Sequence, residues 1–133
     1  MDERYLLDTN TASYIIKGKP GAVKHLLKIP MSSICISTIT EAELLLGVEK
    51  MPDAKHLPIA VGEFLLRVDI LPWDSQAAQI YAVMRASCEQ KGICLGAMDM
   101  LLAAHASSIG ATFVTSDKAF KKISHFLKIA DWS

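Results

Sequence analysis

The chain has 133 residues, half of them hydrophobic and about a fifth charged, which is the size and composition of a single globular domain. No apolar run approaches the roughly 20 residues of a membrane-spanning helix, and the cysteines at 35, 88 and 94 fit neither a disulfide framework nor a zinc site. The formal net charge is zero, with 14 basic and 14 acidic side chains, so charge alone does not favour a nucleic-acid partner.

Short apolar runs alternate with longer helical periods, which predicts an α/β fold with a central, mainly parallel sheet flanked by helices, in one domain spanning residues 1–133. The first half of the chain should contain a strand at 5–7, helices at 9–17 and from 20 to just before Pro30, a strand at 34–37, and a helix beginning near 38. Thr38 with Glu41 and Thr40 with Glu43 have capping-box spacing at the start of that last helix.

The second half continues this alternation. A long helix is expected from Pro52-Asp53 to about 68, with Pro58 and Gly62 as interruptions. Further elements are expected in the order strand 69–71, helix 75–91, helix 97–108, strand 112–115, helix 118–123 and edge strand 126–129. Asp53 and Asp74 stand at helix starts, and we interpret both as caps. The acidic N-terminus, followed by a very short apolar stretch, is not typical of a secretory signal, so we expect a cytoplasmic protein.

Four carboxylates stand at comparable places in these predicted elements. Asp8 follows the first strand, and Asp117 follows the strand at 112–115. Glu43 and Asp99 lie in the first turns of two helices. Ligands of open α/β sheets bind outside the carboxyl ends of the strands, and helix N-termini point to the same edge. We therefore expect these four acids to converge on one cleft.

Such a cluster is unfavourable without a cation, because like charges at short range repel and raise one another's pKa. Hard divalent ions such as Mg²⁺ and Mn²⁺ select oxygen ligands, and they can activate water and neutralise a phosphodiester. The pattern thus indicates hydrolysis of a nucleic-acid backbone without a serine, cysteine or histidine nucleophile. Each acid taken singly is equally consistent with helix capping. Glu41 competes with Glu43, and only one of the two can face the cleft.

Several blocks of the chain resemble the PIN-domain ribonucleases, and the VapC toxins most closely. The first is residues 6–10 (LLDTN), which looks like the family's first strand with its first metal-binding Asp, here Asp8. The other blocks are 36–47 (ISTITEAELLLG), 96–106 (GAMDMLLAAHA), 113–120 (FVTSDKAF) and 131–133 (DWS), the last similar to the tail of the enteric-type VapC subgroup. The Glu-Leu pair of the second block favours Glu43 over Glu41 as its acid.

The resemblance implies a PIN fold and an endoribonuclease toxin of a type II toxin–antitoxin pair, dependent on Mg²⁺ or Mn²⁺. It implies Asp8, Glu43, Asp99 and Asp117 as catalytic metal-binding residues, supported by Thr9, Asn10, Thr115 and Ser116. It also implies a homodimer, inhibition by a VapB antitoxin in a toxin–antitoxin hetero-oligomer, and an RNA substrate. By analogy with the enteric-type subgroup, that RNA is the anticodon loop of initiator tRNA.

Two other functions are open at this point. A PIN domain without activity would serve as a protein-binding module, although the presence of all four acids argues against it. A phospho-accepting receiver domain would need an Asp after a central strand, whereas Asp69 precedes its strand. Two further side chains are assigned structural roles. His105 lies one and a half turns after Asp99, so it should face away from the acids and be packed or partly exposed. Phosphate contact is one interpretation of Arg85, but a solvated helix face is favoured.

Overall fold

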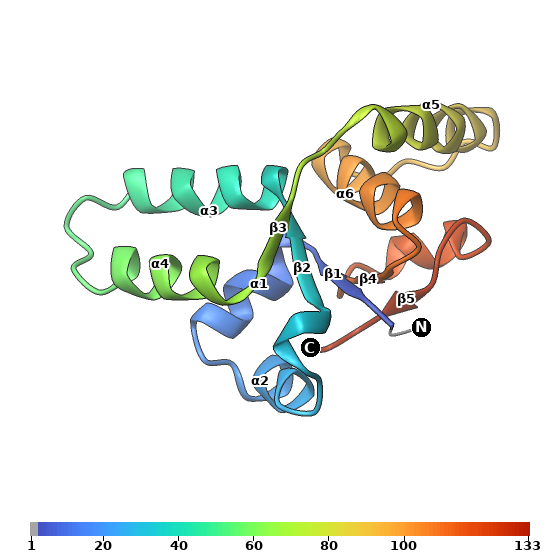
Figure 1. Cartoon of the computed structure of the whole chain (residues 1–133). Coiled ribbons are helices and arrows are strands. Elements are labelled where there is room, and N and C mark those ends of the chain that lie inside the picture. Colours follow the sequence, from blue (N-terminus) through green and yellow to red (C-terminus); the bar gives the residue numbers. More distant parts are fainter. Residues whose placement is uncertain (1–2) are drawn as a thin grey trace.

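The computed structural model of the protein describes residues 3–133 and is built on a five-stranded, entirely parallel sheet (Figure 1). The strand order is β3-β2-β1-β4-β5. The strands are β1 (Tyr5–Leu7), β2 (Ile34–Ser37), β3 (Asp69–Leu71), β4 (Thr112–Val114) and β5 (Ile129–Ala130). Because β1 is central and pairs with both β2 and β4, the carboxyl ends of these three neighbouring strands lie together at one edge of the sheet.

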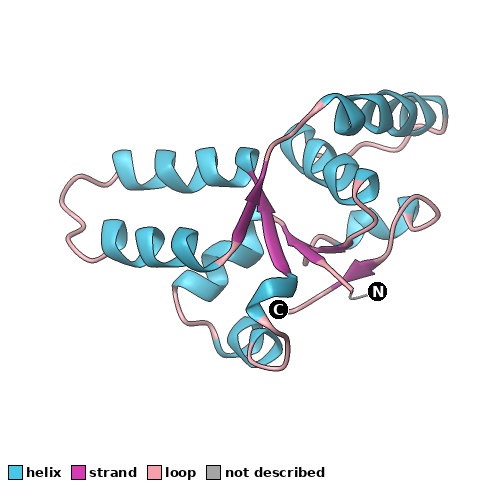
Figure 2. Ribbon diagram, in the orientation of Figure 1, coloured by secondary structure: helices cyan, strands magenta, loops and turns pink. Residues whose placement is uncertain are grey.

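Helices flank this sheet on both sides, as expected for parallel strands joined by crossover connections (Figure 2). They are α1 (Thr9–Ile16), α2 (Pro20–Leu26), α3 (Thr38–Glu49), α4 (Leu57–Arg67), α5 (Ser75–Gln90) and α6 (Ala97–Ser108). Two short 3₁₀ helices complete the fold, η1 (Met31–Ser33) and η2 (Lys118–Ile123). The predicted α/β class with a parallel sheet flanked by helices is confirmed. In the described part of the chain, no helix is long and apolar enough to cross a membrane.

The helix expected from Pro52-Asp53 to about 68 begins later than predicted. Residues 51–56 form turns, and α4 starts at Leu57. Pro58 therefore lies in the first helical turn, where its missing N–H has no intrahelical partner to lose. The interpretation of Asp53 as a helix cap is wrong, because the N-cap of α4 is His56. The expected cap at Asp74 is present, and its Oδ1 accepts a hydrogen bond from the Ala77 N–H at 3.1 Å.

The predicted edge strand at 126–129 is shifted along the chain. Pairing with β4 begins at Ile129, which lies opposite Phe113, and continues to Ala130. The residues before it turn instead, with the Phe126 N–H bonded to the Ile123 carbonyl at 2.9 Å. The apolar side chains of Phe126 and Leu127 signalled a strand, but they pack against the core from this turn.

The core has two parts, one on each face of the sheet, and alternation along the strands separates them. Leu6, Cys35 and Phe113 pack with α5, α6 and η2. Their chain neighbours point the opposite way, so that Leu7 and Val114 pack with α1, α3 and α4. Successive strand side chains point to opposite faces, and both faces are buried, which explains why the strands read as continuous apolar runs.

Candidate active site

Asp8 lies at the carboxyl end of the central strand β1, where the chain turns into α1. Its side chain is 2% exposed, and its backbone N–H donates to the Val114 carbonyl of β4 at 2.9 Å. The carboxylate caps α1, since Oδ1 accepts a hydrogen bond from the Thr11 N–H at 2.7 Å. Capping and ligand binding are compatible, because this hydrogen bond leaves the second carboxylate oxygen free.

Glu43 lies in the second turn of α3 and is tied to the start of α1. The Thr9 hydroxyl donates to Oε1 of Glu43, and the same hydroxyl lies 3.1 Å from the buried hydroxyl of Thr40. The cap of α3 is Ser37, whose Oγ accepts from the Ile39 N–H at 3.1 Å. The predicted capping boxes are therefore wrong, because Thr40 lies inside the helix. Thr40 stands three residues before Glu43, and this spacing places the two side chains on one face of α3, where the Thr9 hydroxyl contacts both.

Asp99 lies in the first turn of α6, half-buried at the helix N-terminus. A Cβ placed on Gly96 would lie 3.4 Å from Oδ2 of Asp99, so the carboxylate folds back over the backbone that precedes its helix. Burial raises the pKa of the Asp99 carboxyl from 3.8 to about 6. Three negative charges add to the effect of burial, and they belong to Asp8, Asp117 and Glu43.

Asp117 follows β4 and is exposed. Its Oδ1 accepts from the Ala119 N–H at 2.9 Å and so caps η2. The buried Thr115 holds the turn before it, because its Oγ1 accepts from the Asp117 N–H at 3.1 Å. Of the other two residues expected to support the site, Asn10 is exposed in the first turn of α1 and Ser116 is half-buried beside Asp117.

The fold thus brings Asp99 into electrostatic range of the other three predicted acids. The four acids do not form a closed ligand cage. Within residues 3–133, no three carboxylate, imidazole or thiolate side chains are placed to hold one metal ion as they stand. The carboxylates of Asp8 and Asp117 accept hydrogen bonds from the backbone N–H groups that they cap, and the carboxylate of Glu43 accepts one from the Thr9 hydroxyl.

The chemistry of these side chains fits a hard divalent cation. The donors are carboxylate oxygens supplemented by threonine hydroxyls, a set that suits Mg²⁺ or Mn²⁺ and not a soft metal. His105, on the same helix as Asp99, is only 1% exposed, as predicted, and the negative charge that acts on it comes from Asp74. The three cysteines are free thiols.

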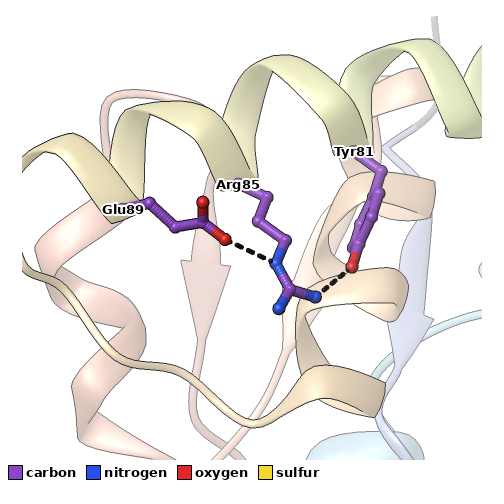
Figure 3. A network of polar contacts seen from close by, with 3 residues as sticks. All are labelled: Tyr81, Arg85 and Glu89. Atoms are coloured by element: carbon purple, nitrogen blue, oxygen red, sulfur yellow. Dashed lines mark hydrogen bonds and ion pairs between the residues drawn. The ribbon is translucent and has the colours of Figure 1, made fainter.

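Arg85, the cation of α5 considered for phosphate contact, is exposed and already engaged (Figure 3). Its Nε donates to Oε1 of Glu89 at 3.1 Å, and its Nη1 donates to the Tyr81 hydroxyl. The three residues lie four apart along one face of α5 and form a local network. This matches the expected solvated helix face, and Arg85 is not needed to explain the acidic site.

Comparisons with known proteins agree with this arrangement. The profile of the PIN-domain family matches residues 5–125. The chain is 36% identical over 131 residues to the tRNA(fMet)-specific endonuclease VapC of Salmonella typhimurium, covering 97% of this chain and 98% of the relative. It is 34% identical to Ribonuclease VapC2 of Rickettsia felis, covering 96% and 97%. The crystal structure of DNA-bound VapBC from Salmonella typhimurium aligns with a TM-score of 0.89 and 34% identity, covering 99% of this chain and 100% of that chain.

The five-stranded parallel sheet and the match of the PIN-domain profile to residues 5–125 together show that the chain belongs to the PIN-domain family. Within that family its near full-length relatives are VapC proteins, so it is a member of the VapC group. The predicted resemblance is confirmed, and the receiver-domain alternative is excluded.

Proposed function

We propose that this protein is the toxin of a type II toxin–antitoxin pair and acts as a metal-dependent endoribonuclease. The observation that carries the proposal is the placement of Asp8, Glu43, Asp99 and Asp117 at the carboxyl edge of the sheet and at the helix starts beside it. Burial of Asp99, together with the charges of the other three acids, raises the pKa of its carboxyl there. A half-buried acid among three others is costly unless a cation is bound there, and perturbed pKa values of this kind mark functional sites.

Asp8, Glu43, Asp99 and Asp117 would hold the ion, and PIN-domain nucleases in general depend on a divalent metal. When bound, Mg²⁺ supplies positive charge that neutralises the scissile phosphate and lowers the pKa of water. The protein's own contribution is orientation. Thr9 fixes the Glu43 carboxylate, Thr115 fixes the backbone at Asp117, and the cap to Thr11 fixes the Asp8 carboxylate. Asn10 and Ser116, which are neighbours of Thr9 and Asp117 in the chain, would add polar groups beside a bound phosphate.

The substrate and partners of the relatives extend the proposal. Relatives are named as a tRNA(fMet)-specific endonuclease and as ribonucleases, and we propose initiator tRNA, cut in its anticodon loop, as the RNA substrate. The aligned crystal structure is a VapBC complex, which supports a VapB-type antitoxin as partner. We further propose a homodimer that the antitoxin binds in a hetero-oligomer, acting in the cytoplasm, where tRNA is available.

The proposal is tested by expressing the protein briefly and sequencing the 5′ ends of cellular RNA. New 5′ ends at one position of initiator tRNA are expected from the natural sequence and none from Asp99→Asn. Asp99→Asn removes one negative charge while keeping nearly the same shape. The purified proteins should show the same contrast with Mg²⁺, and EDTA should abolish cleavage. Equal cleavage by a folded Asp99→Asn protein would contradict the assignment, and no cleavage by either would support an inactive, protein-binding PIN domain.

A further inference from the structure

A cavity of about 270 Å³ opens directly beside the acidic site, between α1, α3 and α4. Thr9 and Glu43, which are joined by a hydrogen bond, form its end nearest the acids. From there it runs along α1 to Lys17, eight residues on, which corresponds to about 12 Å of helix. Because the cavity shares these two residues with the site, it lies within reach of a polymer held at the acids.

The two walls of this cavity differ in chemistry. The α1 wall carries the polar groups, with Thr9, Asn10 and Ser13 offering hydroxyl and amide groups beside the apolar Ile16, and the exposed ammonium of Lys17 lies at its far end. The opposite wall is apolar and carries Leu44 of α3 and Leu57 and Val61 of α4. A flat ring with hydrogen-bonding edges and a nearby negative charge fits such a site. Its volume lies just below the usual range for small-molecule sites, roughly 300–1,000 Å³, so it suits a single base and not an extended ligand.

Gly47 of α3 keeps the cavity open. It lines the cavity, and a Cβ built on it would meet no heavy atom within 4 Å. Glycine in a helix interior is destabilising by about 0.5–1 kcal/mol relative to alanine, and the φ angle of Gly47 is not positive. Neither the backbone conformation nor a close contact therefore requires glycine at position 47. The absence of a side chain there leaves space in the cavity on the Glu43 side.

The geometry points to a nucleotide-binding subsite here: the cavity between α1, α3 and α4 takes the base of the RNA nucleotide next to the scissile phosphate. Leu44 and Leu57 contact the face of the base, and Asn10 and Ser13 hydrogen-bond its edge. Lys17 pairs with the following phosphate. This inference deepens the proposed ribonuclease function and rests on it for the choice of RNA as ligand. It assigns the sequence preference of the enzyme to the α1–α3 side of the site.

The test is Gly47→Leu, which fills the cavity, with Gly62→Leu of α4 as its matched control. Gly62 is also a helical glycine whose added Cβ meets nothing within 4 Å, but it does not line this cavity. The purified proteins are incubated with Mg²⁺ and single-stranded RNA of randomised sequence, and the 5′ ends of the products are sequenced. We expect Gly47→Leu to lose base preference at the position next to the cut and to cleave about tenfold more slowly or worse, as for a group excluded from an apolar pocket. Gly62→Leu should match the natural sequence within about twofold.

A second measurement does not depend on cleavage. AMP, GMP, CMP and UMP are titrated into ¹⁵N-labelled protein in EDTA, and the amide signals of Leu44 and Ser13 are followed. At least one nucleotide should shift both signals in the natural sequence and in Gly62→Leu, and none should do so in Gly47→Leu.

Should Gly47→Leu fail to fold, the exposed Lys17→Glu replaces it, with exposed Lys24→Glu of α2 as control. Lys17→Glu should then raise KM for RNA about tenfold or more, with Lys24→Glu unchanged.

The outcomes separate this inference from the proposed function. Unchanged base preference in an active Gly47→Leu enzyme, or nucleotide shifts that spare the cavity, would overturn the subsite. Loss of antitoxin binding by Gly47→Leu with RNA cleavage intact would assign the cavity to a protein side chain and also overturn it. If the natural sequence cleaves no RNA but a nucleotide shifts Leu44 and Ser13, the ribonuclease proposal fails and the base-binding cavity stands.

Discussion

The hydroxyl of Thr9 on α1 donates a hydrogen bond to Glu43 on α3, joining two elements 34 residues apart in the sequence. This hydrogen bond sets the direction of one predicted metal-binding carboxylate. Thr9→Val removes the hydroxyl while preserving shape, so Glu43 loses its donor. We expect Mg²⁺ affinity, measured by calorimetry, to fall about tenfold or more, as for other residues that orient metal ligands. Thr9→Ser keeps the hydroxyl and should stay close to the natural affinity. Equal affinity of the Val and natural proteins would show that Thr9 has no orienting role.

Asp99 should make the ion-free protein less stable as pH rises. Because its pKa is raised to about 6 in the folded state, folding favours the protonated carboxyl, and this stabilisation is lost as pH rises from 3.8 through 6. In EDTA, Asp99→Asn should therefore unfold in urea at a free energy about 1–2 kcal/mol higher than the natural protein at pH 7.5, a figure reduced from the full shift for solvent screening. The difference should vanish near pH 4.

Added Mg²⁺ should reverse the order of these two proteins at pH 7.5, because only the natural sequence has the full carboxylate set. A constant difference between them from pH 4 to pH 8 would contradict the assigned pKa. A stabilising effect of Mg²⁺ on Asp99→Asn equal to that on the natural protein would exclude Asp99 as a ligand.

His105 should have the opposite pH dependence. Its ring is 1% exposed and its Nδ1 has no hydrogen-bond partner in the described structure. Burial lowers its pKa below 6.5, so the folded state favours the neutral ring, and stability is lost as pH falls through 6.5. His105→Leu keeps a similar volume without the unpaired nitrogen, and we expect equal or greater stability, by up to about 2 kcal/mol at pH 5.5. A loss of more than about 2 kcal/mol at every pH would indicate a partner for Nδ1, such as a buried water.

The two aspartates predicted as caps provide a paired stability test. Asp74 accepts the Ala77 N–H at the start of α5, whereas Asp53 lies in the turn before α4. Asp74→Ala should lower the free energy of unfolding by about 1 kcal/mol, the usual cost of a lost N-cap. Asp53→Ala should stay within about 0.5 kcal/mol, as for most surface positions. Similar losses for both, measured by chemical denaturation, would contradict this difference.

Much of the fold could be predicted because local signals agreed with one another. The strands ending at Leu7 and Ser37 are apolar runs, and parallel strands buried on both faces produce such runs. The beginning of α4 was missed because Pro52-Asp53 has the same local pattern as a helix start, and only the position of Pro58 in the first turn distinguishes the two. The final strand was misplaced because the apolar side chains of Phe126 and Leu127 pack against the core from a turn, whereas strand pairing begins only at Ile129.

The candidate site was predictable as a set of acids but not in its details. Strand ends and helix starts locate Asp8 and Asp99 at one edge, since chain topology alone fixes that edge. The sequence does not show that Thr9 bonds Glu43 and not its own helix, because this depends on how α1 packs against α3. Nor does it show that the carboxylates of Asp8 and Asp117 accept capping hydrogen bonds from Thr11 and Ala119, because each could equally have been directed at the site.

Asp8, Glu43 and Asp99 are expected to share one divalent cation. Anomalous diffraction from crystals grown with Mn²⁺ tests this expectation most directly, because the scattering locates the ion independently of any assay. We predict one strong peak about 2.0–2.3 Å from an oxygen of each of the three carboxylates, with Asp117 beside it. A peak bound to other side chains, or none at saturating Mn²⁺, would contradict a cation shared by these three carboxylates.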